Sequence, residues 1–150
     1  MNAKSNTGRA IKIPARGTIE ESFEVDFRFP AMNRLLYGDG NVTVERVRPY
    51  GLATFNNTLV NGNEVVLIVD EDGMAKRLPF NSRASFIYGW QFHGQPILGD
   101  AYLVGETVAH YEDGPDWVFT GLPESLTLEV VAGIVLTASL AMNERELAGK

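Results

Sequence analysis

The sequence predicts an α+β domain built on a mainly antiparallel sheet of about five to seven short strands. Two observations support this fold class. Stretches of alternating polar and apolar residues recur along the 150-residue chain, and turns rich in Gly, Asn and Asp separate them. Three other segments have helical features, so we expect two short helices and a longer C-terminal helix.

The chain begins with polar and small residues. Residues 1–8 predict a flexible tail, which leaves residues 9–150 as a single domain. Residues 10–13 form the first expected strand, and Pro14 and Gly17 end it. A chain of this length buries about two thirds of its unfolded surface, so the domain needs no disulfide or metal to fold.

The segment from residue 18 to residue 29 alternates polar and apolar side chains. This period of two indicates a half-buried strand, which is a candidate second arm of a hairpin with residues 10–13. The apolar members fall on odd positions: Ile19, Phe23, Val25, Phe27 and Phe29. We therefore expect these side chains to share one face of the strand.

A short helix is expected over residues 29–38, because a proline suits its first turn and a glycine suits its end. Strand alternation resumes over residues 42–48, and residues 50–55 are a further candidate strand. Residues 64–69, with the sequence EVVLIV, are mostly apolar and β-branched. This run predicts a central strand that is buried on both faces.

An acidic turn follows at residues 70–73. It shares its acidic composition with a calcium loop, but the regular spacing of oxygen ligands and the distal Glu of such a loop are missing. We therefore predict a turn and no calcium site. We expect a short strand over residues 74–78, and then a helix that Asn81 or Ser82 caps and that Gly89 ends.

The C-terminal third contains three further expected elements. A turn at residues 98–100 leads into a strand over residues 101–104, which Gly105 stops, and residues 116–119 form a last short strand. Residues 125–148 form the longest expected helix, although alternating apolar residues at its start also fit a strand. The run is too short and too polar to span a membrane. Its wide apolar surface predicts a homo-oligomer, most simply a two-fold dimer.

Composition excludes several classes of function. The net charge of -6 argues against general binding to nucleic acid or to anionic membranes. The absence of cysteine excludes disulfides, thiolate zinc sites and cysteine nucleophiles. No secretory signal opens the sequence, so we expect a cytoplasmic protein. Residues 1–19 contain four basic and no acidic side chains, and this basic start either folds onto its own domain or grips an anion.

Catalytic patterns are scarce, so we expect no enzymatic activity, resident metal or cofactor. The chain has two histidines, His93 and His110, without the His-x3-His spacing of a zinc site. No nucleophile elbow surrounds a serine, and no glycine-rich phosphate loop is present. The enzymatic alternative is a small hydrolase or transferase in which His93 works with Asp100 or another carboxylate.

One group of residues does predict a ligand. Arg77, Asn81, Arg83, Trp90 and His93 lie close together in the sequence. Arginine forks suit phosphate, aromatic faces suit a base, and a helix that begins near Asn81 would add N–H donors toward an anion. We therefore predict a ligand-binding pocket for a small anionic nucleotide. In the alternative, the cations are simply exposed and the aromatic side chains lie in the core or at a dimer contact.

Short motifs resemble a family of small phage and mobile-element proteins that is defined only as a domain of unknown function. The central motifs are a Leu-Pro-x-Asn step, a short helix and an Ile-x-Gly-Asp strand entry, found in EVVLIVDEDGMAKRLPFN (64–81), RASFIYG (83–89) and PILGDAYLVGE (96–106). RAIKIPARGTIEE (9–21), MNRLLYG (32–38) and VTVERV (42–47) also resemble the start of the family. Residues 56–63 and the C-terminal helix depart from its shorter members. The resemblance implies a compact α+β domain in a mobile-element context, without catalytic residues to transfer.

Size, charge and this resemblance together predict a non-catalytic, phage-type binding protein that counters a host defence system in the cytoplasm of the host cell. In one version, it sequesters a nucleotide signal. In the alternative, its acidic surface binds and inhibits a protein of a defence or restriction complex. The two versions require different partners, an anionic small molecule or a host protein.

Overall fold

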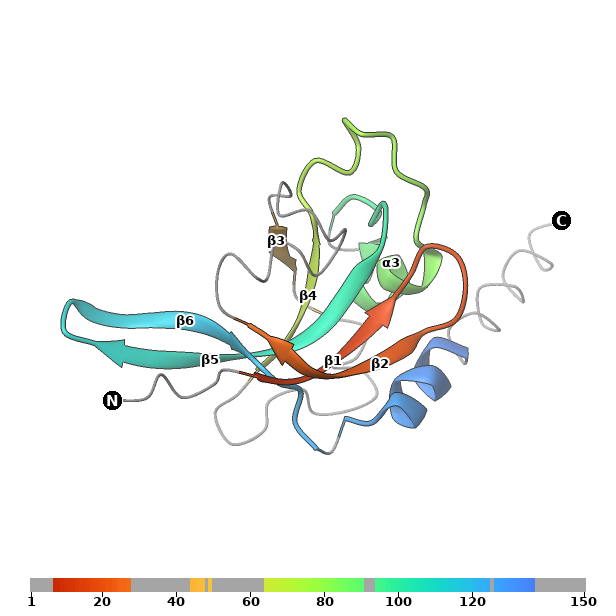
Figure 1. Ribbon diagram of the computed structural model, residues 1–150. Coiled ribbons are helices and arrows are strands. Elements are labelled where there is room, and N and C mark those ends of the chain that lie inside the picture. The colour runs from red at the N-terminus through yellow and green to blue at the C-terminus, as the bar shows by residue number, and fades with distance from the viewer. Residues whose placement is uncertain are drawn as a thin grey trace, which may run out of the picture.

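The computed structural model describes residues 7–27, 44–47, 49, 64–90, 94–124 and 126–136. It confirms the α+β class, with an antiparallel sheet of short strands and two helices (Figure 1). The labelled elements are β1 (Thr7–Ile13), β2 (Glu20–Asp26), β3 (Val44–Val47), β4 (Glu64–Asp70), α3 (Ser82–Tyr88), β5 (Ala101–Tyr111) and β6 (Gly114–Thr120). A second helix covers residues 128–136.

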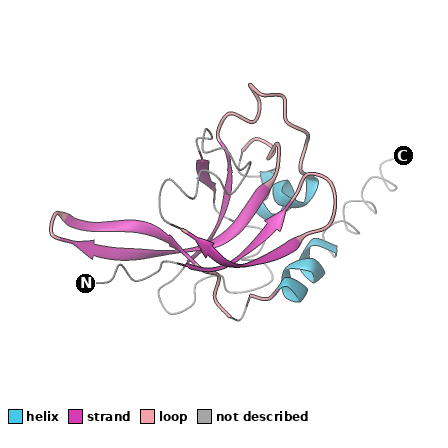
Figure 2. Ribbon diagram, viewed as in Figure 1, coloured by secondary structure: helices cyan, strands magenta, loops and turns pink. Residues whose placement is uncertain are grey.

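Strand β5 organises the sheet, whose order is β2-β1-β5-β4-β3, with β6 also paired to β5. One edge of β5 pairs with β4, and the other pairs first with β1 and then, from Gly105 onward, with β6. The β5–β6 pair extends from the body as a two-stranded arm, and both helices lie toward the opposite end of the sheet (Figure 2).

The prediction that Gly105 stops β5 is wrong, because the strand continues to Tyr111. Gly105 instead permits a close approach of two backbones. A Cβ atom at this position would lie 2.4 Å from the carbonyl oxygen of Gly121, which is shorter than any van der Waals contact. Gly105 therefore allows the backbone of Gly121 to pass close to β5, and it does not end the strand.

The predicted hairpin of β1 and β2 is confirmed, but its regular alternation is broken. The pairing passes from Gly8↔Val25 to Ala10↔Ser22, so a bulge interrupts the register. Glu24 within the bulge has a φ of +56°, in the left-handed region. A bulge shifts the following side chains to the other face. Phe23 is consequently 67% exposed, whereas Phe27 is buried.

Both faces of the sheet carry apolar core, as the run in β4 predicts. All of residues 65–70 are buried, and alternate side chains join two separate clusters. One cluster packs the sheet against α3 and the helix over residues 128–136. The other lies on the opposite face and consists of Ala10, Phe27, Val66, Ile68, Tyr102, Val104 and Phe119. Both described helices pack on the face of the first cluster, and the burial of apolar side chains there stabilises this arrangement.

The C-terminal helix is helical from residue 128, so the strand alternative for its first residues is wrong there. Val131, Ile134 and Val135 are buried in the core, at helical spacing. The described helix contains nine residues, and its predicted continuation to residue 148 lies outside the described residues. Within the part of the chain that the structure describes, no helix has the length and hydropathy to cross a membrane.

Two other groups of predictions have different outcomes. The predicted strand over residues 74–78 is wrong, because residues 71–77 form turns in which Lys76 N–H donates to the Asp72 carbonyl. The predicted helix over residues 29–38, the strand over residues 50–55 and nearly all of the predicted tail lie outside the described residues.

The basic start of the chain folds onto its own domain in the described residues. Arg9 forms an ion pair with Glu21, and its other guanidinium nitrogen donates to the carbonyl oxygens of Pro123 and Leu126 at 2.8 and 2.9 Å. Lys12 lies 3.7 Å from a carboxylate oxygen of Asp100. These two cations therefore join β1 to other segments of the fold.

Candidate functional site

Asn81, a predicted ligand-binding residue, is the N-cap of α3 and is fully buried. Its side-chain oxygen accepts the N–H of Ala84 at 2.9 Å, as an N-cap requires. Its Nδ2 donates to the carbonyl oxygens of Ile13 at 2.7 Å and Gly99 at 2.9 Å. Every polar group of this side chain is thus engaged with backbone, which assigns Asn81 a structural role.

Arg83, on the first turn of α3, also binds backbone. Its Nη2 donates to the carbonyl oxygens of Pro14 at 2.7 Å and Gly17 at 2.6 Å, in the loop between β1 and β2. The guanidinium therefore fastens α3 to the hairpin. At this end of the seven-residue helix, the Asn81 side chain already occupies the N–H of Ala84, so that first-turn donor is not left for an anion.

The other predicted ligand-binding residues do not join Asn81 and Arg83 in a pocket. Arg77 is exposed at the end of the turn over residues 71–77, with a φ of +55°. Trp90 is half-buried and contacts the ring of Phe80 edge-on, with centroids 6.1 Å apart. His93 lies outside the described residues.

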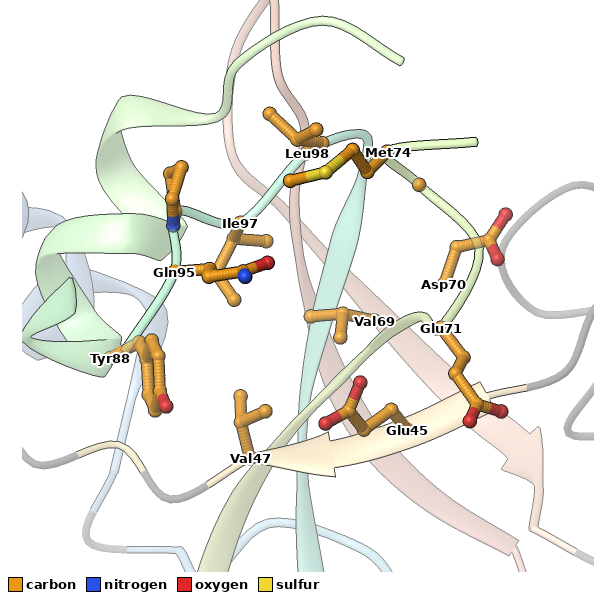
Figure 3. Close-up of a pocket in the computed structure, with 12 residues that line it drawn as sticks. Glu45, Val47, Val69, Asp70, Glu71, Met74, Tyr88, Gln95, Ile97 and Leu98 are labelled. Carbon is orange, nitrogen blue, oxygen red and sulfur yellow. The ribbon is translucent and has the colours of Figure 1, made fainter. Parts of the chain in front are cut away.

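A pocket of about 250 Å³ lies elsewhere, at the edge of the sheet where β3 meets β4 (Figure 3). It is bordered by the start of the turn after β4, the end of α3 and residues 95–98. Its lining consists of Glu45, Val47, Val69, Asp70, Glu71, Gly73, Met74, Tyr88, Gln95, Pro96, Ile97 and Leu98. None of Arg77, Asn81, Arg83 and Trp90 belongs to this lining.

The predicted N-cap nevertheless builds one wall of the pocket. The backbone N–H of Asn81 donates to the Ile97 carbonyl at 2.9 Å, and Ser85 Oγ accepts the Ile97 N–H at 2.8 Å. These bonds hold the segment around Ile97 against α3. Asn81 therefore acts on the pocket by positioning its wall, without reaching into it.

Two carboxylates on β4 and its turn differ in how they are used. Asp70 is buried, and it accepts the Lys76 ammonium at 2.8 Å and the Asp72 N–H at 2.8 Å. These contacts compensate its charge within the turn. Glu71, its neighbour, is exposed. Figure 3 shows both carboxylates at the outer side of the pocket, whereas the Glu45 carboxylate lies closer to Val47 and Val69.

A second buried carboxylate lies on the opposite face of the sheet. Glu106 of β5 is 2% exposed and forms an ion pair with Arg46 of β3. The Arg46 guanidinium carbon also lies 5.9 Å from the ring centroid of Phe119, within range of a cation–π contact. Glu106 is the buried partner, and removing Arg46 would take away a compensating charge, so this cluster joins β3, β5 and β6 structurally.

Tyr102 is the described group with a clear pKa shift. Burial against the second core cluster raises the pKa of its phenol above the usual 10.0, and the nearby charges of Asp100 and Glu20 raise it further. The neutral phenol is therefore the form that the fold favours. No cluster of three or more His, Cys, Asp or Glu side chains suitable for a metal occurs among the residues that the structure describes.

No family model matches the chain, and no curated protein sequence matches it. Among solved structures, it is similar to the crystal structure of the small RNA methyltransferase HEN1, with a TM-score of 0.55 and 22% sequence identity. The match covers 88% of this chain and 16% of that chain. At this identity the likeness shows the fold alone.

Sequence reasoning missed the pocket because its lining comes from separated segments of ordinary composition. Glu45 and Val47 come from an edge strand, and Gln95 and Ile97 come from a loop. One signal was available, because Glu45 and Val47 are two residues apart on a strand and therefore face the same side. An inward-facing charge on an edge strand also protects that edge against pairing with another chain, so this signal indicates the edge of the sheet as well as a polar group at the pocket.

Proposed function

We propose that this chain is a non-catalytic binding protein whose binding site is the pocket between β3, β4, α3 and residues 95–98. The pocket carries the proposal, because a concave site that combines carboxylate and amide groups with apolar side chains suits the holding of a ligand. The resemblance to phage and mobile-element proteins extends the proposal to a role against a host defence system in the host cytoplasm.

Of the two versions of this role, the inhibition of a defence or restriction protein has more support. Three of the side chains that line the pocket are acidic, and the chain carries a net charge of -6. An acidic pocket disfavours phosphate groups and favours a basic partner. The nucleotide version depends on Arg77, Arg83 and Trp90, which lie outside the pocket lining. It stays a prediction for the surface around α3.

The enzymatic alternative has less support. It pairs His93, which lies outside the described residues, with Asp100 or another carboxylate. One Asp100 oxygen accepts the Ala15 N–H at 2.9 Å, and the other lies 3.7 Å from Lys12. The Asp100 carboxylate therefore already has structural partners. A catalytic role for it would require these contacts to be given up.

A homo-oligomer is part of the proposal. The helix over residues 128–136 exposes Val130 and Leu136, and Leu136 is 62% exposed. Apolar side chains on a helix surface are common at subunit interfaces. Sedimentation at micromolar concentration should show a species of at least twice the 16.5 kDa chain, and Leu136→Glu should shift it toward the monomer. A wild-type monomer would contradict this part of the proposal.

Recovery of a ligand from lysate tests the binding function. The full chain is incubated in host lysate, repurified and denatured, and the released material is compared by mass spectrometry with the lysate. We expect the captured molecule to be released chemically unchanged and at stoichiometric yield. Time-dependent conversion of any compound by the pure protein, abolished by His93→Ala, would show an enzyme instead.

A further inference from the structure

We infer that the pocket takes an organic cation, an ammonium or guanidinium group carried on a short apolar stem. This inference rests on the proposed binding function and adds the chemistry of the ligand. The supporting features are the direction of Glu45, the compensation of Asp70, the apolar side chains within the lining and the size of the pocket.

The pairing of β3 with β4 puts Glu45 on the pocket side. Glu45 pairs with Val69, and Val47 pairs with Leu67. Side chains of paired residues lie on the same face of a sheet, so Glu45 and Val47 share the face of the Val69 and Leu67 side chains. That face carries α3 and the main core cluster. A carboxylate thus lies at the margin of an apolar face.

The adjacent residue of the same strand has the opposite environment. Arg46 faces the other side of the sheet, where Glu106 and Phe119 hold its guanidinium. Arg46 is therefore directed away from the pocket. Among the described residues, no cation forms an ion pair with Glu45. Since Lys76 neutralises Asp70, Glu45 is the carboxylate nearest the apolar walls that can accept a ligand cation.

The walls suit an aliphatic stem. Val47 and Val69 lie nearest the Glu45 carboxylate, Ile97 lies across the pocket beside Gln95, and the ring of Tyr88 lies at one end (Figure 3). Gln95 extends its amide toward the same space, and an amide oxygen is a second acceptor for N–H donors. An alkyl chain would contact the apolar side chains of the lining, and its charged head would lie between the Glu45 carboxylate and the Gln95 amide.

The volume limits the size of this ligand. About 250 Å³ is below the roughly 300–1,000 Å³ of pockets that take drug-sized molecules. A single alkylammonium or alkylguanidinium group is of this scale. A free amine and the side chain of a Lys or Arg on a partner protein share this chemistry.

Binding of model cations tests the inference directly. n-Pentylammonium and n-butylguanidinium are titrated into the full chain, and methyl chemical shifts of Val47, Val69 and Ile97 are followed by NMR. n-Pentanol, ADP-ribose and inorganic phosphate serve as neutral and anionic probes. We expect saturable shifts with both cations, about fivefold weaker binding of n-pentanol, and no pocket shifts with the anions. Equal binding of n-pentanol, or pocket shifts with an anion, would overturn the inference.

A matched pair of variants isolates the carboxylate. Glu45→Gln and Glu129→Gln each remove one exposed negative charge, but Glu129 lies on the helix over residues 128–136, outside the pocket lining. We expect Glu45→Gln to weaken cation binding about fivefold and Glu129→Gln to leave it unchanged. Shifts outside the pocket report whether each variant is folded. Equal affinity of the two folded variants contradicts the inference.

Capped peptides with a central Lys or Arg distinguish the sources of the cation. Tighter binding of a peptide than of the matching free cation indicates a protein partner, and equal or weaker binding indicates a free amine; both outcomes support the cation. If neither cation nor peptide binds while an unchanged ligand is still recovered from lysate, this inference fails and the binding function stands. Conversion of a lysate compound would refute the binding function itself.

Discussion

The N-terminal end of α3 and the edge of the sheet at β3 both present polar side chains, but the two regions use them differently. At α3, the side chains of Asn81 and Arg83 donate hydrogen bonds to backbone carbonyl oxygens of β1 and of neighbouring loops. At β3, Glu45 borders a cavity that polar and apolar side chains line together. The comparison teaches that a cluster of polar residues in sequence indicates a binding site only when the fold leaves those groups unengaged.

Asn81→Ala is expected to have the largest effect on stability. It removes the cap of α3 and two bonds to buried carbonyl oxygens, so we expect the free energy of unfolding to fall by about 3 kcal/mol. Urea denaturation measures this loss. Ser82→Ala, at the exposed next position, is the control and should change stability by less than about 0.5 kcal/mol. Equal losses of stability in Asn81→Ala and Ser82→Ala would contradict the structural role assigned to Asn81.

Arg83→Ala is expected to have a smaller effect of about 1 kcal/mol, because its two bonds to the β1–β2 loop are partly exposed. The matched control is Arg77→Ala, which removes an exposed arginine from a turn. We expect no stability loss from this control, measured in the same urea series. If Arg77→Ala and Arg83→Ala instead weaken binding of a nucleotide without a change in stability, the α3 end is a site after all.

Tyr102→Phe tests the raised pKa of Tyr102, through the way that stability depends on pH. The folded pKa of Tyr102 is raised above 10.0, so the stability contributed by the neutral phenol is fully present below pH 10. It is lost as the pH rises through the folded pKa. The free energy of unfolding of the wild type should therefore fall above pH 10 more steeply than that of Tyr102→Phe. Parallel curves for the two proteins between pH 9 and 11 would contradict the assigned shift.

Glu45→Gln should have the smallest effect on stability, within about 0.5 kcal/mol, because Glu45 is exposed and has no ion pair among the described residues. Thermal or urea unfolding at pH 7 measures this difference. A loss above 1 kcal/mol would assign Glu45 a structural role like that of Asn81. The proposed difference between the two regions, structural at α3 and ligand-binding at β3, would then be wrong.

Local patterns predicted much of the fold. The apolar run of β4, the cap and glycine end of α3 and the pairing of β1 with β2 all follow from short stretches of sequence. The errors came from distant contacts. The bulge that exposes Phe23 depends on pairing with β1, and Gly105 lies within a strand because Gly121 crosses beside it.

The candidate site divides in the same way. The sequence identified Asn81 as a helix cap, since that role depends on the next three residues. The sequence also suggested Asn81 and Arg83 as ligand-binding residues. Their hydrogen bonds to the carbonyl oxygens of Ile13, Pro14 and Gly99 could not be predicted from it. These partners lie up to 69 residues away along the chain.

The sequence by itself determined the α+β class, the central buried strand and the ends of α3, because the period of apolar residues and the caps act over a few residues. Only the tertiary structure decided which polar groups are left for a ligand. Hydrogen bonds and cavities form between segments that are distant in the chain, and their satisfaction depends on how these segments meet. Glu45 and Asn81 look equally polar in sequence, but only Glu45 borders an open pocket.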